Sequence, residues 1–317
     1  MEVILAQPRG FCAGVDRAIN ILEAVVVKYG SSRDIYVLHE IVHNAYVVES
    51  YKSRNVQFVS RLEDVPDNGL VVFSAHGVSS KVREVAREKN LFVIDATCPL
   101  VTKVHLEIKK YASHGKRIVL IGHAGHREVE GSMGQVTDEV ILVSSVDDVH
   151  KLKIDDDPNR PMAYVTQTTL SVDDTEKIVQ ALRSRFPNMV GPAASDICYA
   201  TQNRQRAIAT LANMVDVALI IGSKNSSNST RLFELAKSRN ERSHFIGSYK
   251  EIEFDWFSGA RKIGITSGAS APDVLVQEVV DHLSEGLDVK VSAMAGVKEN
   301  VVFKLPQLVD IPESVAQ

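Results

Sequence analysis

The hydrophobic pattern of the chain alternates between two periods. Short runs rich in Val, Ile and Leu, such as those at 118–121 and 217–221, predict buried strands. Segments such as 13–30 and 99–115 place apolar residues three or four positions apart, which predicts amphipathic helices. Strands that alternate with helices along a whole chain are typical of an α/β fold with parallel sheets.

This order of elements repeats three times. In each third a helix is followed by a strand that ends in a polar loop, and later by a strand that runs into small and hydroxyl residues. The repeat predicts three α/β domains related by a pseudo-three-fold axis. Their expected bounds are 1–97, 98–195 and 196–283, and residues 284–317 are expected to form a tail that packs back on the first domain.

The three cysteines of the chain, Cys12, Cys98 and Cys198, occur once per third, each just before a predicted helix. An odd number of widely spaced cysteines is a poor disulfide framework. One cysteine thiolate in each repeat predicts one shared metal centre, either an iron–sulfur cluster or a zinc ion. With three cysteine ligands, one coordination position would stay open for substrate. Three unrelated buried cysteines are the alternative.

The predicted strand ends carry polar side chains that suit an anion. Ligands of parallel α/β sheets bind beyond the carboxyl ends of the strands. There the first two thirds supply His43, His76 and His126, whose imidazoles can donate hydrogen bonds to phosphate oxygens. The last third supplies the hydroxyl-rich loops GSKNSSNST and SGASAPD. The alternative is that these residues are structural histidines and helix caps.

Glu128 is the best candidate for moving protons, because it lies two residues from His126 in the same predicted loop. A carboxyl group that is shielded from water there would keep its proton near neutral pH. Glu130 is the competing acid nearby.

The composition of the chain argues against nucleic-acid and membrane partners. The 317 residues carry 36 Lys and Arg against 40 Asp and Glu, a net charge of −4, with no long basic run, so a nucleic-acid partner is not expected. No apolar run approaches the roughly 20 residues that span a bilayer, so no membrane partner is expected either. The first residues read as a strand and not as a secretory signal, which predicts a cytoplasmic protein.

The segments PRGFCAGVDRA, DATCPLVTKVH and DICYATQNRQ, together with the loops EIVHN, SAHGVS, GHAGH, TQTTLSVDDT, GSKNSSNS and SGASAPD, closely resemble the 4-hydroxy-3-methylbut-2-enyl diphosphate reductase family. The resemblance runs from the first strand to about residue 280. It implies a trefoil of three α/β domains around a central cavity. It also implies one 4Fe-4S cluster with three cysteine ligands, here Cys12, Cys98 and Cys198, and one open iron site.

The resemblance also implies roles for the loop residues. Those that hold the substrate diphosphate would be His43, His76, His126, Ser226, Ser227, Asn228 and Ser270. Thr168 would lie near the substrate hydroxyl, and Glu128 would deliver the proton. The chain departs from the family at Arg127, where Pro is common, and the role of Glu128 would be weakened if Arg127 paired with it.

The implied reaction is the reductive dehydroxylation of the substrate to isopentenyl and dimethylallyl diphosphates, the last step of the non-mevalonate (methylerythritol phosphate) isoprenoid route. No nicotinamide or flavin site is recognisable in the sequence, so ferredoxin or flavodoxin is the expected electron donor. Two other functions stay open. One is a three-cysteine zinc hydrolase of a phosphorylated small molecule, and the other is an iron–sulfur redox sensor.

Overall fold

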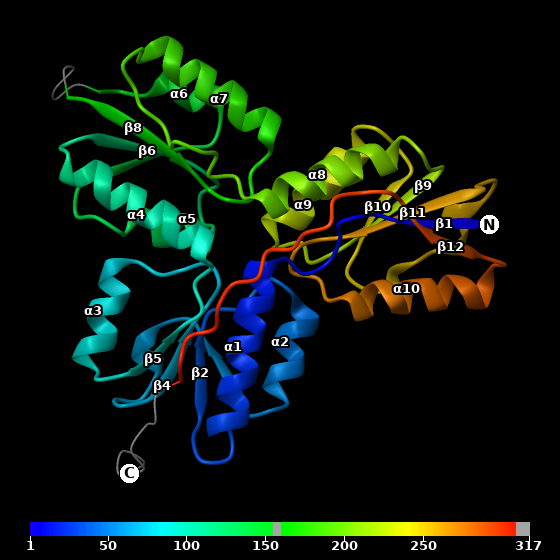
Figure 1. Cartoon of the computed structure of the whole chain (residues 1–317), viewed down its shortest axis with the longest axis horizontal. Helices are drawn as coiled ribbons and strands as arrows, with labels where there is room; N and C mark the ends of the chain where they lie inside the picture. The colour runs from blue at the N-terminus through cyan, green and yellow to red at the C-terminus, as the bar shows by residue number, and fades with distance from the viewer. Residues whose placement is uncertain (155–159, 309–317) are drawn as a thin grey trace. The chain divides into compact units, whose positions relative to one another are not determined.

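The computed structural model describes residues 1–154 and 160–308 (Figure 1). Their strands form three sheets in which every pairing is parallel. The predicted α/β class with parallel sheets is therefore confirmed. The chain forms two compact units. The first unit comprises Met1–Asp16, His43–Val48 and Tyr199–Val302, and the second comprises Arg17–Val42, Glu49–Cys198 and the described residues from Phe303 on.

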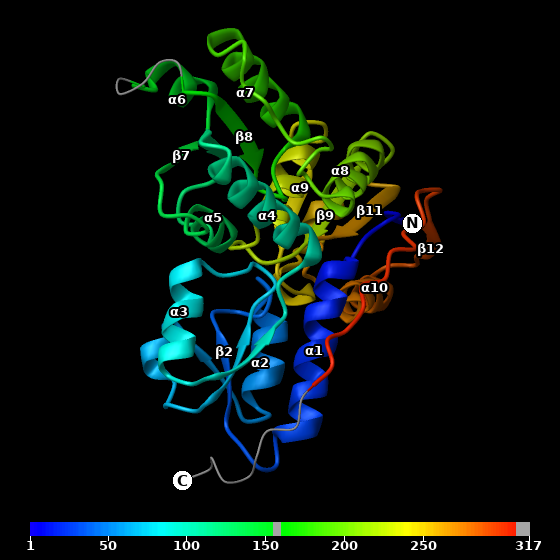
Figure 2. The same cartoon turned by 60° about the vertical axis from the view of Figure 1, so that its left-hand side comes forward.

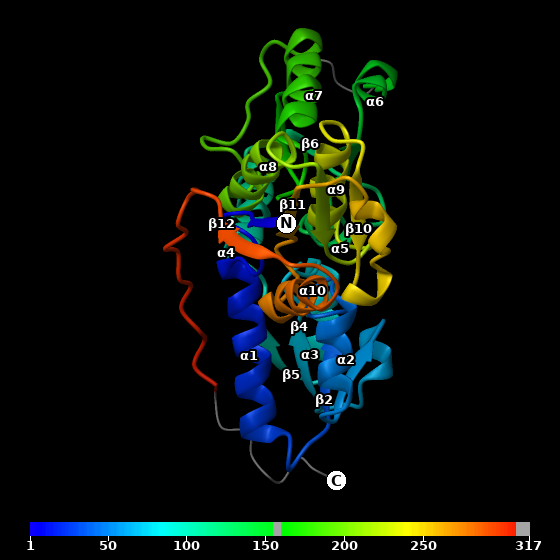
Figure 3. The same cartoon turned by 90° about the vertical axis from the view of Figure 1, so that its right-hand side faces the viewer.

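The first unit contains a five-stranded sheet. Its strands in spatial order are β10 (Ser243–Ile246), β9 (Val217–Ile221), β11 (Lys262–Ser267), β1 (Glu2–Leu5) and β12 (Lys290–Ala293). The N-terminal strand thus lies between β11 and β12, and Figure 3 shows β12 beside it. Residues from the two ends of the sequence complete one sheet.

Helices cover both faces of this sheet (Figure 1). Side chains alternate along β9, so that Leu219 packs toward one face and Ile220 toward the other. One core contains residues of α10 (Asp273–Gly286) and the other contains residues of α8 (Tyr199–Ala212) and α9 (Ser227–Lys237). Two short 3-10 helices, η2 (Tyr249–Glu251) and η3 (Phe254–Phe257), follow β10.

The second unit contains two smaller sheets. The strands of the four-stranded sheet are, in order, β3 (Val56–Val59), β2 (Ile35–Leu38), β4 (Leu70–Phe73) and β5 (Phe92–Asp95). Those of the three-stranded sheet are β7 (Val140–Val143), β6 (Arg117–Ile121) and β8 (Met162–Thr166). The inner strands β2, β4 and β6 are buried along their whole length and, apart from Arg117, carry apolar side chains, as is expected for parallel strands covered on both faces. The outer strands β3, β5 and β7 are partly exposed.

The three-stranded sheet is likewise enclosed by helices. One core joins it to α4 (Pro99–Ser113) and α5 (Arg127–Met133), and the other joins it to α6 (Val146–Lys151) and α7 (Val172–Arg185). Figure 2 shows α4 and α7 on either side of β8. The helices associated with the other sheet are α3 (Ser80–Glu88), with η1 (Leu62–Asp64) against it, and the parts of α1 (Ala13–Tyr29) and α2 (Ala45–Lys52) that belong to this unit.

The same strand topology occurs three times. The orders β3-β2-β4, β7-β6-β8 and β10-β9-β11 all place the first strand of a repeat between its second and its third. The first and third strands of each repeat are therefore neighbours, and the loops that follow them begin at the same edge of the sheet. Such a point, where the order of strands reverses, is the usual ligand site of an open α/β sheet.

Two details differ from the sequence pattern. The short apolar run at 189–192 makes only an isolated parallel bridge between Val190 and Ala163. Gly191 and Pro192 follow immediately, and Pro lacks the amide hydrogen that would continue the ladder. The strand β1, placed by sequence in the domain 1–97, pairs in the sheet of the last repeat. The division into three domains stays a prediction, and residues 309–317 of the expected tail lie outside the described residues.

Candidate functional site

The candidate residues occupy equivalent positions in loops that follow the strands. The fifth residues after β2, β6 and β9 are His43, His126 and Ser226. The third residues after β4, β8 and β11 are His76, Thr169 and Ser270. The repeat predicted from the sequence therefore applies to individual loop residues, which lie at equivalent positions after equivalent strands.

The cysteines are attached to these loops by one recurring hydrogen bond. In each repeat the cysteine backbone N–H donates to the carbonyl of the second residue after the third strand. The pairs are Cys12 with Ala269 (3.3 Å), Cys98 with Ala75 (3.0 Å) and Cys198 with Thr168 (3.0 Å). All three cysteines are partly buried and none forms a disulfide. Three thiol side chains with the same backbone anchor fit the soft donor set of an iron–sulfur cluster.

Cys12 has an environment of its own. Burial raises the pKa of its thiol, while the charge of Arg204 and hydrogen bonds from the amides of Val15 and Gly14 act in the opposite direction. In the metal-free chain the thiol is therefore held protonated, although α1 begins next to it.

Glu128 lies in the second unit and is 3% exposed. Its two carboxyl oxygens both contact Thr168: the backbone N–H donates to Oε1 at 2.6 Å and Oγ1 donates to Oε2 at 2.9 Å. The loop after β6 positions the acid, because His126 caps α5 and its Nδ1 accepts the backbone N–H of Glu128 at 3.1 Å. The carboxyl group is thus fixed by two strand-end loops.

Burial raises the pKa of Glu128 to about 7. The hydrogen bonds from Thr168 favour the charged form, and the negative charge of Asp196 disfavours it, but loss of water is the largest effect. At neutral pH the group exists in both protonation states. It can therefore donate or accept a proton without a large free-energy cost.

Arg127 does not pair with Glu128. Its Nη1 donates to Oε2 of Glu130 at 2.8 Å, and both side chains are largely exposed, at 41% and 50%. The exposed carboxylate of Glu130 is engaged with this neighbour, whereas Glu128 is turned into the protein. Of the two acids named from the sequence, only Glu128 is shielded from water.

Two of the candidate histidines, both in the second unit, lie against each other. The rings of His76 and His126 are 5.9 Å apart and nearly perpendicular, and Nδ1 of His76 lies 3.2 Å from Oγ of Ser74. The loop of His76 is also the loop whose Ala75 carbonyl accepts the N–H of Cys98. Contacts therefore connect Cys98, the two histidines, Glu128, Thr168 and Cys198 within one unit.

In the first unit, hydroxyl groups of two loops converge. Oγ of Ser270 donates to the carbonyl of His43 at 3.0 Å and lies 3.4 Å from Oγ of Ser226. Ser226 caps α9 by accepting the N–H of Ser229, and Ser227 is the first residue of that helix. The positive end of a helix dipole is thus added to the hydroxyl groups, an arrangement that favours anions.

Asn228 is 4% exposed, yet neither Oδ1 nor Nδ2 has a hydrogen-bond partner within residues 1–154 and 160–308. A buried amide without a partner costs about 1–3 kcal/mol. Both atoms lie at the start of α9, next to Ser226 and Ser227. The amide of Asn228 therefore has unused capacity for hydrogen bonds.

Sequence reasoning missed a buried ionic cluster beside Cys198. The carboxylate of Asp196 is fully buried, accepts the N–H of Thr166 at 3.0 Å and pairs with Lys103 at 3.0 Å. Burial, followed by the charge of Asp196, raises the pKa of Glu107 to about 7. Acidic and basic residues on a predicted helix are usually exposed, so only the position of Asp196 two residues before a cysteine could have drawn attention to the cluster.

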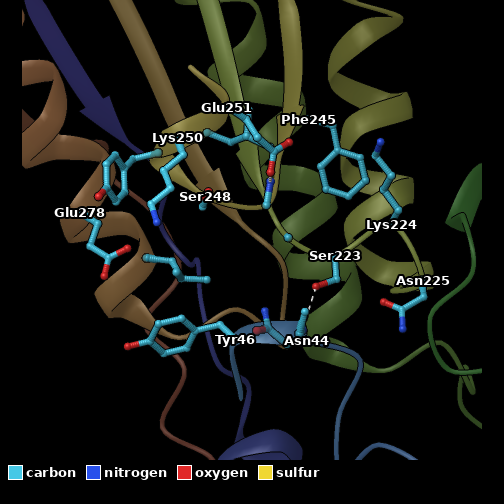
Figure 4. A pocket seen from close by; sticks show the side chains of 16 residues that line it. Asn44, Tyr46, Ser223, Lys224, Asn225, Phe245, Ser248, Lys250, Glu251 and Glu278 are labelled. Carbon is cyan, nitrogen blue, oxygen red and sulfur yellow. Dashed lines mark hydrogen bonds between the residues drawn. The ribbon is translucent and has the colours of Figure 1, made fainter. Parts of the chain in front are cut away.

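A pocket of about 840 Å³ lies in the first unit beside the loop that leads into Ser226 (Figure 4). Lys224 and Lys250 line it together with the ring of Phe245, and Oγ of Ser223 accepts the N–H of Ala45 at 3.3 Å at its edge. Its lining does not include Ser226, Asn228 or Ser270. The pocket therefore adjoins the hydroxyl cluster without containing it.

The described parts of the chain contain no group of three or more His, Cys, Asp or Glu residues that could hold a metal ion. Cys12 belongs to the first unit, and Cys98 and Cys198 belong to the second. A centre that joins all three therefore stays a prediction. The same described residues include no helix long and apolar enough to cross a bilayer.

Known proteins are similar to this chain in sequence and in fold. A family profile described as LytB protein matches residues 3–284. A relative from Anaplasma marginale (strain St. Maries), named 4-hydroxy-3-methylbut-2-enyl diphosphate reductase, is 59% identical over 308 residues, which are 97% of this chain and 90% of the relative. A relative of the same name from Wolbachia pipientis wMel is 54% identical over 311 residues, covering 98% of this chain and 100% of the relative.

Two solved structures are similar as well. The E-1-hydroxy-2-methyl-but-2-enyl-4-diphosphate reductase of Plasmodium falciparum has a TM-score of 0.91 and 38% identity, and the match covers 96% of this chain and 95% of that one. A second structure, described as (E)-4-hydroxy-3-methyl-but-2-enyl diphosphate reductase, the terminal enzyme of the non-mevalonate pathway, has a TM-score of 0.64 and 33% identity, with coverage of 90% and 99%.

Proposed function

The chain belongs to the LytB protein family, and on that premise we propose that it reduces 4-hydroxy-3-methylbut-2-enyl diphosphate to isopentenyl and dimethylallyl diphosphates, the last step of the non-mevalonate isoprenoid pathway. The reaction breaks the bond between the allylic carbon and its hydroxyl oxygen. It consumes two electrons and two protons, and the oxygen leaves as water.

The cofactor proposed is one 4Fe-4S cluster with three cysteine ligands, Cys12, Cys98 and Cys198. When bound, a cluster with one open iron site supplies single electrons and a Lewis acid. The common anchoring of the three cysteine amides to strand-end loops supports this assignment. The external electron donor proposed is ferredoxin or flavodoxin, and the cytoplasm is the proposed location of the reaction.

Glu128 is the proposed proton donor, and its burial beside Thr168 with a pKa of about 7 is the observation that carries the mechanism. The protonated carboxyl group would give its proton to the departing hydroxyl oxygen, because hydroxide is a poor leaving group. The hydroxyl of Thr168, held by Oε2, would orient the substrate hydroxyl. The two hydrogen bonds to Thr168 keep the resulting carboxylate in place.

The substrate diphosphate would be held by the polar loops. The residues proposed for this role are His43, His76, His126, Ser226, Ser227, Asn228 and Ser270. The unpartnered amide of Asn228 and the two adjoining hydroxyls of Ser226 and Ser270 support it in the first unit. Holding the diphosphate fixes the other end of the substrate relative to the proton donor, and such positioning contributes to the rate.

Anaerobic purification with iron, sulfide and zinc analysis tests the proposal, together with turnover of the diphosphate substrate by a chemical reductant. We expect iron and sulfide in equal amounts and formation of both products. Cys98→Ser is expected to lose both cluster and turnover, whereas Leu106→Ser, on the exposed side of the helix that follows Cys98, is expected to keep them. Normal turnover in Cys98→Ser would refute the ligand role of Cys98.

The two competing functions give different results in the same material. Zinc without sulfide, with hydrolysis of phosphorylated compounds, would indicate the zinc hydrolase. A cluster without turnover, together with an electrophoretic shift of DNA, would indicate the redox sensor.

A further inference from the structure

Arg204 carries a buried charge that the proposed chemistry does not use. Its side chain is 1% exposed and belongs to α8 of the first unit. Nε and Nη2 donate to the carbonyl of Gly10 at 3.1 and 2.8 Å, Nη2 also donates to the carbonyl of Phe11 at 3.1 Å, and Nη1 donates to the carbonyl of Ala200 at 3.0 Å. The planar guanidinium group thus joins a helix to the two residues that precede Cys12.

These two carbonyls determine the path of the chain into Cys12. Gly10 has a φ of +67°, a conformation that L side chains rarely adopt, so the turn depends on glycine and on what holds its peptide groups. On the other side of the turn, the N–H of Cys12 donates to the carbonyl of Ala269. The position of the thiol is therefore set by Arg204 before it and by a strand-end loop beside it.

The counter-charge comes from the far end of the sequence. Nη1 of Arg204 lies 3.2 and 3.1 Å from the two carboxylate oxygens of Glu299, whose side chain is 15% exposed. Nδ2 of Asn203 donates to Oε1 of the same carboxylate at 3.0 Å. Glu299 belongs to residues 294–302, which follow β12 and contain no helix or strand (Figure 3).

This segment is held against the N-terminal strand at further points. The N–H of Met294 donates to the carbonyl of Leu5 at 3.0 Å. A Cβ added at Gly296 would lie 2.0 Å from the carbonyl oxygen of Gln7, so only glycine allows the two backbones to approach so closely. Glu299 is therefore brought to Arg204 by backbone contacts, and the pairing is part of a built structure.

Arg204 and Glu299 thus place two opposite charges beside the turn that leads into Cys12. Removal of one member of a buried pair leaves the other charge uncompensated. The reduction potential of a cluster depends on the net charge near it.

We propose that Arg204 and Glu299 are positioning residues for Cys12. Arg204 holds the Gly10–Phe11 turn, and the carboxylate of the tail balances its charge and so sets the potential of a cluster bound at Cys12. The second half of this inference rests on the proposed function, and the first half does not.

The test uses three variants of the full-length protein, prepared anaerobically. Glu299→Gln preserves size but leaves the guanidinium charge unbalanced, and Arg204→Lys preserves charge but cannot reach all its acceptors. Glu285→Gln makes the same charge change at an exposed position of α10 and is the control. The measurements are hydrogen exchange of the amides at 10–16 and 294–302, iron retained after gel filtration, and the midpoint potential of the cluster.

Arg204→Lys is expected to increase exchange at 10–16 by at least about tenfold and to lose iron, because the ammonium group cannot make all the hydrogen bonds that the guanidinium group makes to Gly10 and Phe11. Glu299→Gln is expected to increase exchange at 294–302 and to shift the midpoint to a more positive potential. Glu285→Gln is expected to change neither.

Wild-type exchange at 10–16 in Arg204→Lys would overturn the positioning role of Arg204. A wild-type midpoint in Glu299→Gln would overturn the charge-balancing role of Glu299. The exchange measurement needs no cluster, so a wild-type protein without iron would count against the proposed function and leave the test of the Gly10–Phe11 turn intact.

Discussion

Replacement of Glu128 by Gln should have opposite effects on turnover and on stability. The amide fits the same space and keeps both contacts with Thr168: its oxygen accepts the backbone N–H, and its nitrogen donates to Oγ1 once the hydroxyl rotates. The amide cannot give up a proton to the leaving oxygen. Glu128→Gln should therefore retain the fold and lose most of its turnover.

The effect on stability follows from the pKa of Glu128. Folding raises this pKa from 4.5 to about 7 because the carboxyl group is buried. As pH rises from 4.5 to 7, the unfolded chain loses this proton while the folded chain still holds it, so the group makes the folded state progressively less stable, and the effect levels off above 7. The shift corresponds to about 3 kcal/mol at high pH. The neutral amide in Glu128→Gln does not titrate and carries no such cost.

Anaerobic urea denaturation of both proteins between about pH 4 and 8 measures this difference. The free energy of unfolding of Glu128→Gln should equal that of the wild type near the lower limit and exceed it by about 3 kcal/mol near the upper one. Glu130→Gln, an exposed acid paired with Arg127, is the matched control and should differ by less than about 1 kcal/mol at every pH. A stability difference between Glu128→Gln and the wild type that does not change with pH would refute the assignment of a raised pKa.

Three further changes test other parts of the site. Asn228→Ala should raise the Michaelis constant for the diphosphate at least about tenfold in steady-state kinetics. Stability should be unchanged or higher, because a buried amide without a partner is removed. An unchanged Michaelis constant would show that Asn228 does not bind the diphosphate. Lys103→Met should destabilise the protein by about 2 kcal/mol in urea, because the buried carboxylate of Asp196 loses its partner, and wild-type stability would contradict this. Gly268→Ala should lower both stability and diphosphate affinity, since its Cβ would lie 2.0 Å from Oγ of Ser229; wild-type behaviour in both assays would show that α9 adjusts freely.

The strand-end loops could be predicted from the sequence because they combine two local signals. A buried β-branched run ends abruptly, and histidine, serine or asparagine follows at a fixed distance, as at His126 and Ser226. The repeat then aligns these positions without any knowledge of long-range contacts. The pairing of β1 with β11 and β12 could not be found in this way, because a strand of four residues carries no information about which edge it joins.

The sequence also did not indicate which charged residues are buried. Arg204 lies on a helix among polar neighbours, and arginine is almost never fully buried unless it is paired. Its partner Glu299 is distant in the sequence and lies outside every helix and strand. No periodicity connects two such residues, so only the folded chain reveals that they meet.

The equivalent loops also explain why, among the described residues, a buried acid in one repeat is hydrogen-bonded whereas a buried amide in another is not. Glu128 and Asn228 are each the seventh residue after the first strand of their repeats, and the first repeat has Ala45 there. Glu128 is satisfied by the hydroxyl and amide of Thr168, whereas the equivalent of Thr168 in the last repeat is Ala269, which has no hydroxyl to offer. Within the described ranges the amide of Asn228 is left without a partner. The same backbone position therefore carries a buried acid in one repeat and a buried amide in another, and the side chain at the equivalent of Thr168 on the neighbouring loop decides whether that group has a partner.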